Sequence, residues 1–467
     1  MPTSTLPGPR GLAQLGPLRR LFLDPQPVLD ELSASYGPVV GLGAGPVRMA
    51  VVGSPVALRE LFATPTDSFR WGHRFNVLGF VVGDQSLIVS DGADHRRRRG
   101  AVQAAFSVRR LQGWVPMIVD QVDAAVERLV ADLPSPAPGG AGATTVDLYP
   151  VGRRIVLEVA IRAFFGARTG ERAVEIGDLF QRPQDYLESN AVHQVPHPFP
   201  HTARSRVRAD RRALDAIVDE EIAARRADPG ADPLDLLDAM VAAGDLSDAE
   251  IRDQVVTLIG AGYDTTAATL AWVLWHAALA PGWWEALRAE ADAVLGAPGS
   301  VPLDHAVLPR LVLADRVVRE SLRLNPAGVI APREAAVDVE VDGYRIRRGT
   351  LVLWSAHLAG RDPSAWPDPL RFDPGRFADL TPEQQALADD AWVPFGRGPR
   401  RCIGFALAQL ELTLALARLV QRLDVEATGP LPRPVGMVVN RPTGGVPLRV
   451  RARAGDPSVA SSMPRSS

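Results

Sequence analysis

The longest helical pattern of the chain runs from Leu246 to Ala280, and Pro281 ends it. Ser247 and Glu250 have the spacing of a capping box, which favours a helix that begins at this point. About 33 residues at 1.5 Å rise each would give a helix about 50 Å long, enough to cross a whole domain. Apolar residues occur on almost every side of it, which predicts a buried helix inside one large body.

Two proline-rich stretches interrupt the helical patterns before this segment. Residues 134–140 predict a loop between helices. Residues 181–201 form a second irregular stretch, between a helix that we expect to end near Leu179 and an arginine-rich helix from residue 203 to 226. A further helical pattern covers residues 405–423, so helices dominate the chain.

Segments with the alternating pattern of β-strands are short and few. Residues 39–40 and 47–52 predict a hairpin. Residues 337–346 and 351–353 alternate around glycine turns, and residues 449–453 predict another strand. The expected fold class is therefore mainly α with small β-sheets.

The composition fits a globular protein with a substantial core, since 46% of the 467 residues are hydrophobic and 22% are charged. A net charge of −3 gives no bulk attraction to nucleic acid or to an anionic membrane. Residues 1–20 are proline-rich and lack a long apolar run, which predicts a flexible segment without a signal peptide or membrane anchor. We expect a cytoplasmic protein with one domain over residues 21–454 and a disordered tail over residues 455–467.

Cys402 is the only cysteine, so no intrachain disulfide can form. It stands in the run Phe-Gly-Arg-Gly-Pro-Arg-Arg-Cys-Ile-Gly at residues 395–404, directly before a helical pattern. A tight loop that enters a helix offers free backbone N–H groups, and Arg400 and Arg401 add positive charge, so the thiolate form is favoured. The alternative for a lone thiol is a buried, inert cysteine.

This run resembles the haem-binding signature of the cytochrome P450 family at Phe395, Gly398, Arg400, Cys402 and Gly404. The resemblance implies a single-domain cytochrome P450 fold in which the long central helix crosses the haem. It also implies haem b as the cofactor and Cys402 as the proximal iron ligand, with Arg400 on a propionate and Phe395 near the sulfur. A thiolate ligand pushes electron density onto the iron and favours O–O cleavage.

The long helix contains the run Ala-Gly-Tyr-Asp-Thr-Thr at residues 261–266. Helical spacing puts Ala261, Asp264, Thr265 and Thr269 on one face. A polar kink with a hydroxyl bonded back to the helix is the alternative. The segment is similar to the oxygen-activation motif of the same family. This similarity implies that Asp264 and Thr265 are catalytic and deliver protons, and that Ala261 lies against the haem.

A third motif is charged and lies at residues 320–323. Glu320 and Arg323 can pair at this helical spacing, although an exposed salt bridge is the default for such a pair. The pair resembles the Glu-x-x-Arg motif of the family, and Arg376 matches its third partner. The resemblance implies that these three residues have a structural role behind the haem.

A fourth motif supplies further cations. His95 and Arg99 share a helix face by their spacing, and the resemblance implies that they bind the haem propionates together with Arg333. Residues 96–98 are three more arginines. They form a solvated basic stripe or face an acidic electron-transfer partner.

The resemblance places substrate contacts in residues 71–87, 181–201 and 327–330 and on the face of the long helix. Candidate pocket residues are Trp71, Phe75, Leu78, Phe80, Val81, Tyr263, Thr269, Val329 and Ile330. The first five lie in a segment that we expect to form a loop. Most of them are apolar, which predicts a lipophilic substrate and leaves fatty acids, terpenes, steroids and macrolides open. Ordinary core packing is the alternative for any one of them.

The resemblance implies a monooxygenase that inserts one oxygen atom of O2 by hydroxylation or epoxidation. The chain ends soon after the helix that follows Cys402, so we expect electrons from a separate ferredoxin and ferredoxin reductase, and a monomeric protein. The alternatives are a haem-thiolate enzyme that uses peroxide, which usually lacks the acid–threonine pair, and a non-enzymatic haem sensor or lipid carrier. A cysteine hydrolase is disfavoured because none of the eight histidines stands in a recognisable partner motif.

Overall fold

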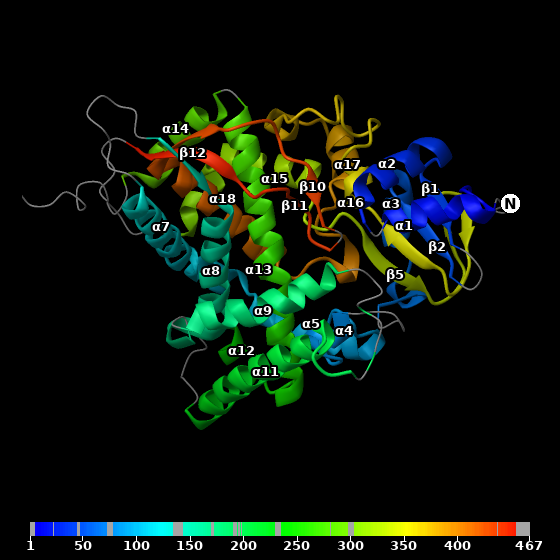
Figure 1. The fold of residues 1–467 in the computed structure, drawn as a ribbon, viewed down its shortest axis with the longest axis horizontal. Helices are drawn as coiled ribbons and strands as arrows, with labels where there is room; N and C mark the ends of the chain where they lie inside the picture. Colours follow the sequence, from blue (N-terminus) through cyan, green and yellow to red (C-terminus); the bar gives the residue numbers. More distant parts are fainter. Residues whose placement is uncertain are drawn as a thin grey trace, which may run out of the picture.

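The computed structural model describes most of the chain, and helix α13 (Asp248–Leu279) runs through its middle (Figure 1). The Glu250 N–H donates to the Ser247 hydroxyl, and the Ser247 N–H donates to the Glu250 carboxylate at 3.1 Å, so the predicted capping box is confirmed. The described residues are 5–21, 23–43, 47–71, 78–133, 143–169, 172–189, 194, 197, 199–228, 235–280, 282–297, 303–436 and 438–453.

The other helices surround α13, so that most of its residues are buried, as the nearly continuous apolar pattern predicts. The main hydrophobic core lies where α7, α8, α13, α15 and α18 meet. The helices are α1 (Leu15–Leu21), α2 (Pro25–Tyr36), α3 (Pro55–Ala63), α4 (Leu78–Val82), α5 (Gly92–Ala105), α6 (Val108–Gly113), α7 (Val115–Asp132), α8 (Tyr149–Thr169), α9 (Ala173–Leu187), α11 (Ala203–Ala227), α12 (Leu236–Ala243), α14 (Trp283–Leu295), α15 (Val312–Leu324), α16 (Ala356–Ala359), α17 (Pro382–Ala391) and α18 (Phe405–Arg422).

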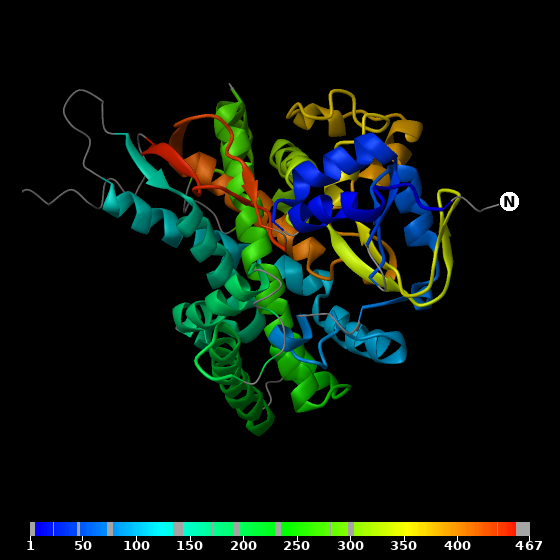
Figure 2. The same ribbon diagram turned by 45° about the vertical axis from the view of Figure 1, so that its right-hand side comes forward.

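The largest sheet has the strand order β1-β2-β8-β5-β3. Its strands are β1 (Val39–Leu42), β2 (Met49–Val52), β3 (Phe69–Arg70), β5 (Ala331–Ala335) and β8 (Leu351–Trp354). The predicted hairpin is confirmed, since β1 and β2 pair antiparallel; β2 and β8 pair parallel. This sheet and α1–α3 form one side of the molecule, apart from α8, α9, α11 and α12, in both views (Figure 1, Figure 2).

Three smaller sheets also occur in the part of the chain that the structure describes. β6 (Val339–Val341) and β7 (Tyr344–Ile346) form a hairpin, as do β10 (Pro434–Val435) and β11 (Arg441–Pro442). β12 (Pro447–Ala452) pairs with both β4 (Thr144–Asp147) and β9 (Leu423–Ala427). The fold is thus mainly α with small sheets, in agreement with the sequence analysis.

The structure corrects two local predictions. Helix α9 continues to Leu187 instead of ending near Leu179, and Pro183 lies inside it. Phe180, Pro183 and Tyr186 are buried, so tertiary packing outweighs the helix-breaking tendency of proline. Residues 78–82 form helix α4, where the sequence predicted a loop, because Val81 and Val82 pack against Tyr186.

The N-terminal segment, for which flexibility stays a prediction, makes contacts with the sheet. Leu15–Leu21 is helical, and Leu18 and Leu21 pack into the cluster formed by α2 and the sheet. The Gly41 N–H donates to the Pro7 carbonyl at 2.7 Å, which ties the segment to β1. The predicted tail over residues 455–467 lies outside the described residues. None of the helices in the described part of the chain combines enough length with enough hydrophobicity for a transmembrane segment.

Candidate active site

The loop before α18 holds Cys402 in a fixed position. Gly396 and Gly398 have φ angles of +65° and +68°, a left-handed conformation that residues with a Cβ rarely adopt. These turns bring the chain back, so that the Cys402 N–H donates to the Phe395 carbonyl at 2.8 Å. The cysteine therefore lies where a glycine loop enters a helix, as the sequence predicted.

The Cys402 thiol is exposed to an interior cavity and otherwise surrounded by protein. Burial raises its pKa, and the backbone N–H groups of Gly404 and Phe405 and the cations Arg99 and Arg401 offset only part of that effect. The sequence predicted a favoured thiolate, but loss of solvation outweighs the positive surroundings in the protein alone. A metal ion bound to the sulfur would shift the balance to the thiolate.

The cavity has a volume of about 370 Å³ and is bounded by α13, α5, α18 and the chain around β5. It contains most of the sequence-predicted haem-site residues. Its lining includes Trp71, Leu87, Ile88, His95, Arg99, Phe106, Val156, Ala160, Phe164, Thr257, Leu258, Ala261, Gly262, Thr265, Thr266, Thr269, Ala327, Gly328, Ala331, Phe395, Arg400, Cys402, Leu407 and Glu411. Apolar side chains and threonine hydroxyls thus surround one thiol and a group of cations.

The polar group consists of the His95 imidazole and the guanidinium groups of Arg99 and Arg400 in the cavity wall, together with Arg333 on β5. Arg400 donates to the Leu87 and Ser90 carbonyls and pairs with Asp91 at 3.1 Å. In the described part of the chain, Asp91 is the one carboxylate that pairs with this group. Excess positive charge therefore collects at one side of the cavity.

Buried polar atoms in this group lack hydrogen-bond partners among the described residues: His95 Nε2, Arg333 Nε and Arg400 Nε. Burial and the neighbouring Arg400 lower the pKa of His95 to about 3, and burial lowers the pKa values of Arg333 and Arg400 to about 10. Each shift shows that a positive charge here is under-compensated. Two carboxylates would complete the site, so these residues fit a haem: the polar group would bind its propionates and Cys402 would bind its iron.

The wall formed by α13 carries small and hydroxyl side chains. Ala261, Gly262, Thr265 and Thr269 all line the cavity. The Thr265 hydroxyl donates to the Ala261 carbonyl at 2.6 Å, and the Thr269 hydroxyl donates to the Thr265 carbonyl at 2.8 Å. This wall offers space and two hydroxyl groups, each of which is bonded back to its own helix.

Asp264 does not line this cavity in the described structure, although the sequence placed it on the same face as Thr265. Its carboxylate is buried and pairs with Arg441 of β11. Adjacent helical residues differ by about 100° around the axis, so Thr265 can face the cavity while Asp264 faces the β10–β11 hairpin.

Glu320, Arg323 and Arg376 meet in a buried network. Arg323 forms two hydrogen bonds to the Glu320 carboxylate at 2.7 and 2.8 Å, and Arg376 Nε donates to the same carboxylate at 2.9 Å. Glu320 and Arg323 are almost completely buried, so the pair is not the exposed salt bridge that such a spacing usually gives.

The candidate substrate residues are divided between the cavity and other places. Trp71 and Thr269 line the cavity. Phe75 lies outside the described residues. The remaining candidates pack elsewhere: Leu78, Phe80 and Val81 against Tyr186, Val329 and Ile330 beside β8, and Tyr263 under Arg153 at 5.0 Å. Leu78, Phe80 and Val81 of α4 thus belong to a local cluster away from the cavity. Ala327, Gly328 and Ala331 line the cavity where Val329 and Ile330 were expected.

The sequence analysis missed Glu411, a carboxyl group in the cavity wall. It lies on α18, is buried, and its Oε1 has no hydrogen-bond partner in the described structure. Burial raises its pKa well above the usual range, because a charged carboxylate would lose its solvation here. The sequence signal that could have identified Glu411 is its position as an acidic residue in the middle of the apolar helical pattern at 405–423.

Comparisons with known proteins agree with this site. A model of the family described as Cytochrome P450 matches residues 6–447. A Mycobacterium tuberculosis protein named cytochrome P450 139 is 33% identical over 446 residues, covering 92% of this chain and 99% of that protein. A Streptomyces melanosporofaciens protein named cyclooctat-9-en-7-ol 5-monooxygenase is 32% identical over 429 residues, covering 90% of this chain and 89% of its own. The solved structure of retinoic acid bound cyanobacterial CYP120A1 matches with a TM-score of 0.83 and 26% identity, covering 96% of this chain and 99% of that chain.

Proposed function

Because this chain belongs to the cytochrome P450 family, we propose that it inserts one oxygen atom of O2 into a lipophilic small molecule by hydroxylation or epoxidation. The family makes it a haem-containing monooxygenase, and we assign haem b as the form of the cofactor. One observation supports this assignment most strongly: Cys402 faces an apolar cavity beside a group of cations that lacks enough carboxylate partners.

When bound at this site, the haem supplies the activation of O2. Cys402 would hold its iron, and His95, Arg99, Arg333 and Arg400 would hold its propionates. Thr265 keeps a hydroxyl at the cavity wall and can pass a proton inward. We propose that Asp264 supplies that proton from outside the cavity, which requires its ion pair with Arg441 to open.

The chemistry of the cavity supports a lipophilic substrate. Its wall combines apolar side chains with threonines and small residues such as Ala261, Gly262 and Ala327. One relative is named for the oxidation of cyclooctat-9-en-7-ol, and the structural neighbour holds retinoic acid; both compounds have a largely hydrocarbon skeleton. We therefore favour a terpene-like substrate over a polar one.

The outer surface behind the Cys402 loop suits an acidic electron donor. A hollow of about 710 Å³ lies there, and its lining includes Arg59, Arg319, Arg397 and Arg401. Long-range attraction between opposite charges speeds the encounter of such partners. We propose that a ferredoxin binds this hollow and that the enzyme works as a monomer.

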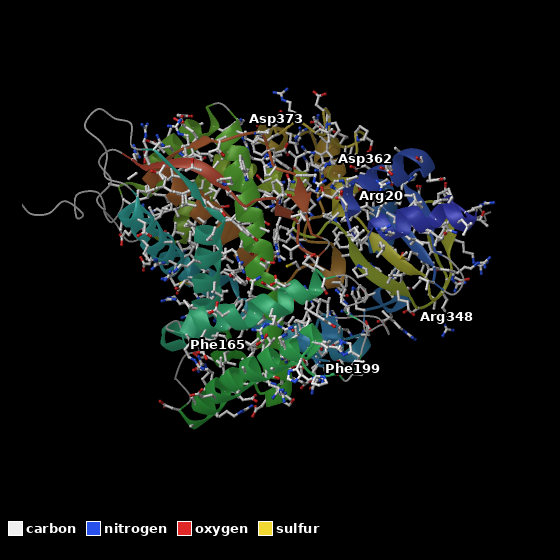
Figure 3. All side chains as sticks on the ribbon, viewed as in Figure 1. Arg20, Phe165, Phe199, Arg348, Asp362 and Asp373 are labelled. Atoms are coloured by element: carbon white, nitrogen blue, oxygen red, sulfur yellow. The ribbon has the colours of Figure 1, made fainter. Side chains whose placement is uncertain are left out.

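Reversing two charges of this hollow, in the Arg59→Glu/Arg397→Glu variant, is expected to raise the KM for reduced ferredoxin roughly tenfold at low salt. The KM of the wild type for reduced ferredoxin should rise towards that of the variant as salt is increased, because salt screens exposed charges. The matched control is Arg348→Glu, an exposed arginine beside the sheet (Figure 3), which should leave the KM unchanged. Equal KM values for all three proteins would place the ferredoxin elsewhere.

Replacing Thr265 with alanine is expected to lower the product formed per electron consumed by about tenfold, because a positioned proton donor is lost. Thr265→Ser keeps the hydroxyl and should retain most of the coupling. The measurement is product against NADPH or dithionite equivalents in a reconstituted ferredoxin system. An unchanged yield in the alanine variant, or turnover by hydrogen peroxide alone, would favour the peroxide-using alternative.

A further inference from the structure

Trp71 contacts Arg400, which lines the cavity, and Arg333, which lies on β5. The Cζ atom of Arg400 lies 4.0 Å from the centre of its ring, and that of Arg333 lies 5.2 Å away. A guanidinium group at these distances over an indole ring is attracted by the negative face of the ring. The tryptophan is therefore engaged by the groups assigned to the haem propionates.

Backbone pairing fixes this arrangement. Trp71 directly follows β3, whose Arg70 pairs with Glu334 of β5, next to Arg333. The Trp71 N–H donates to the Asp91 carboxylate at 2.9 Å, and the same carboxylate pairs with Arg400. The backbone at Trp71 is thus fixed both at the sheet edge and at the N-terminus of α5.

Arg333 sits among three aromatic rings. Its Cζ lies 5.1 Å from the ring centre of Phe62, 5.0 Å from that of Phe69 and 5.2 Å from that of Trp71. The side chain is buried, and no carboxylate in the described part of the chain pairs with it. The rings hold the guanidinium in place but leave its charge available for an anion in the cavity.

We propose that Trp71 is a cofactor-positioning residue, whose indole ring holds Arg333 and Arg400 in the orientation that binds the haem propionates. The sequence analysis gave Trp71 a different role, as part of the substrate pocket. The inference rests on the proposed function for the location of the haem. It goes further by giving an uncharged aromatic side chain a share in cofactor retention.

Haem retention tests this proposal without a substrate. Haem dissociation from the oxidised holoprotein is measured by its transfer to an excess of apomyoglobin. Trp71→Leu is expected to release haem roughly tenfold faster than the wild type, because it lacks a π-face for the two guanidinium groups. Trp71→Phe keeps an aromatic ring and should stay within about threefold of the wild type. Trp283→Leu, a half-buried tryptophan of α14 outside the cavity, is the control for general loss of packing and should not change the rate.

A double-mutant cycle shows whether Trp71 acts through Arg333. In an Arg333→Gln background, which already loses haem faster, adding Trp71→Leu should have a clearly smaller effect than in the wild type. Wild-type haem loss from Trp71→Leu, equal rates for the leucine and phenylalanine variants, or full additivity with Arg333→Gln would each overturn the proposal. Failure of the wild type to take up haem would instead overturn the proposed function.

Discussion

Replacing Cys402 with serine is expected to abolish the red-shifted Soret band of the reduced, carbon-monoxide-bound protein. That band requires a thiolate on the iron, and a neutral hydroxyl cannot push comparable electron density onto the metal. The chain has no second cysteine that could take over the role. Monooxygenase turnover should fall to background with the band.

Haem uptake by the serine variant is the control that separates loss of the thiolate from loss of the whole site. The cations that we assign to the propionates are unchanged, so the variant should still bind some haem and show an ordinary Soret absorption. A spectrum identical to that of the wild type would contradict Cys402 as the iron ligand. If both the wild type and the serine variant remained colourless, the haem site as a whole would be contradicted.

The second large effect is expected in the buried charge network. Arg323→Ala should destabilise the protein by about 3–5 kcal/mol, because it leaves the Glu320 carboxylate buried without its main partner. It also removes donors to the backbone carbonyls of Gly360, Pro369 and Arg371. Urea unfolding of the holoprotein, followed by circular dichroism and by haem absorption, measures the loss.

Arg20→Ala is the matched control for this prediction. Arg20, labelled in Figure 3, also forms two hydrogen bonds to a glutamate, Glu31, at 2.8 and 2.7 Å. Both of these side chains are exposed. Solvent screens an exposed pair, so the urea midpoint should hardly move. Similar midpoints for Arg323→Ala and Arg20→Ala would show that burial does not strengthen the network.

The elements that the sequence predicted well are those fixed by local signals. The capping box at Ser247 and the apolar residues around it define where α13 begins and why it is buried. The glycines before Cys402 define a turn that few other residues could adopt. The Glu320–Arg323 spacing indicated a pair, although only the fold shows that it is buried.

The predictions that differ from the structure depend on contacts between distant segments. Arg441 is 177 residues from Asp264, so no local pattern indicates that the carboxylate turns away from the cavity. Pro183 is tolerated in α9 because the helix packs on buried neighbours. Phe80 and Val81 pack against Tyr186. Their apolar character alone does not distinguish such core packing from a contact with substrate.

The contact between Arg400 and the carbonyl of Leu87 joins residues 313 positions apart in the chain. During synthesis at about 5–20 residues per second, the earlier residue would leave the ribosome roughly 15 to 60 seconds before its partner. The enclosure for the cofactor is therefore completed only after residue 400 has been synthesised. A nascent chain stalled before residue 400 should acquire helices yet fail to capture haem.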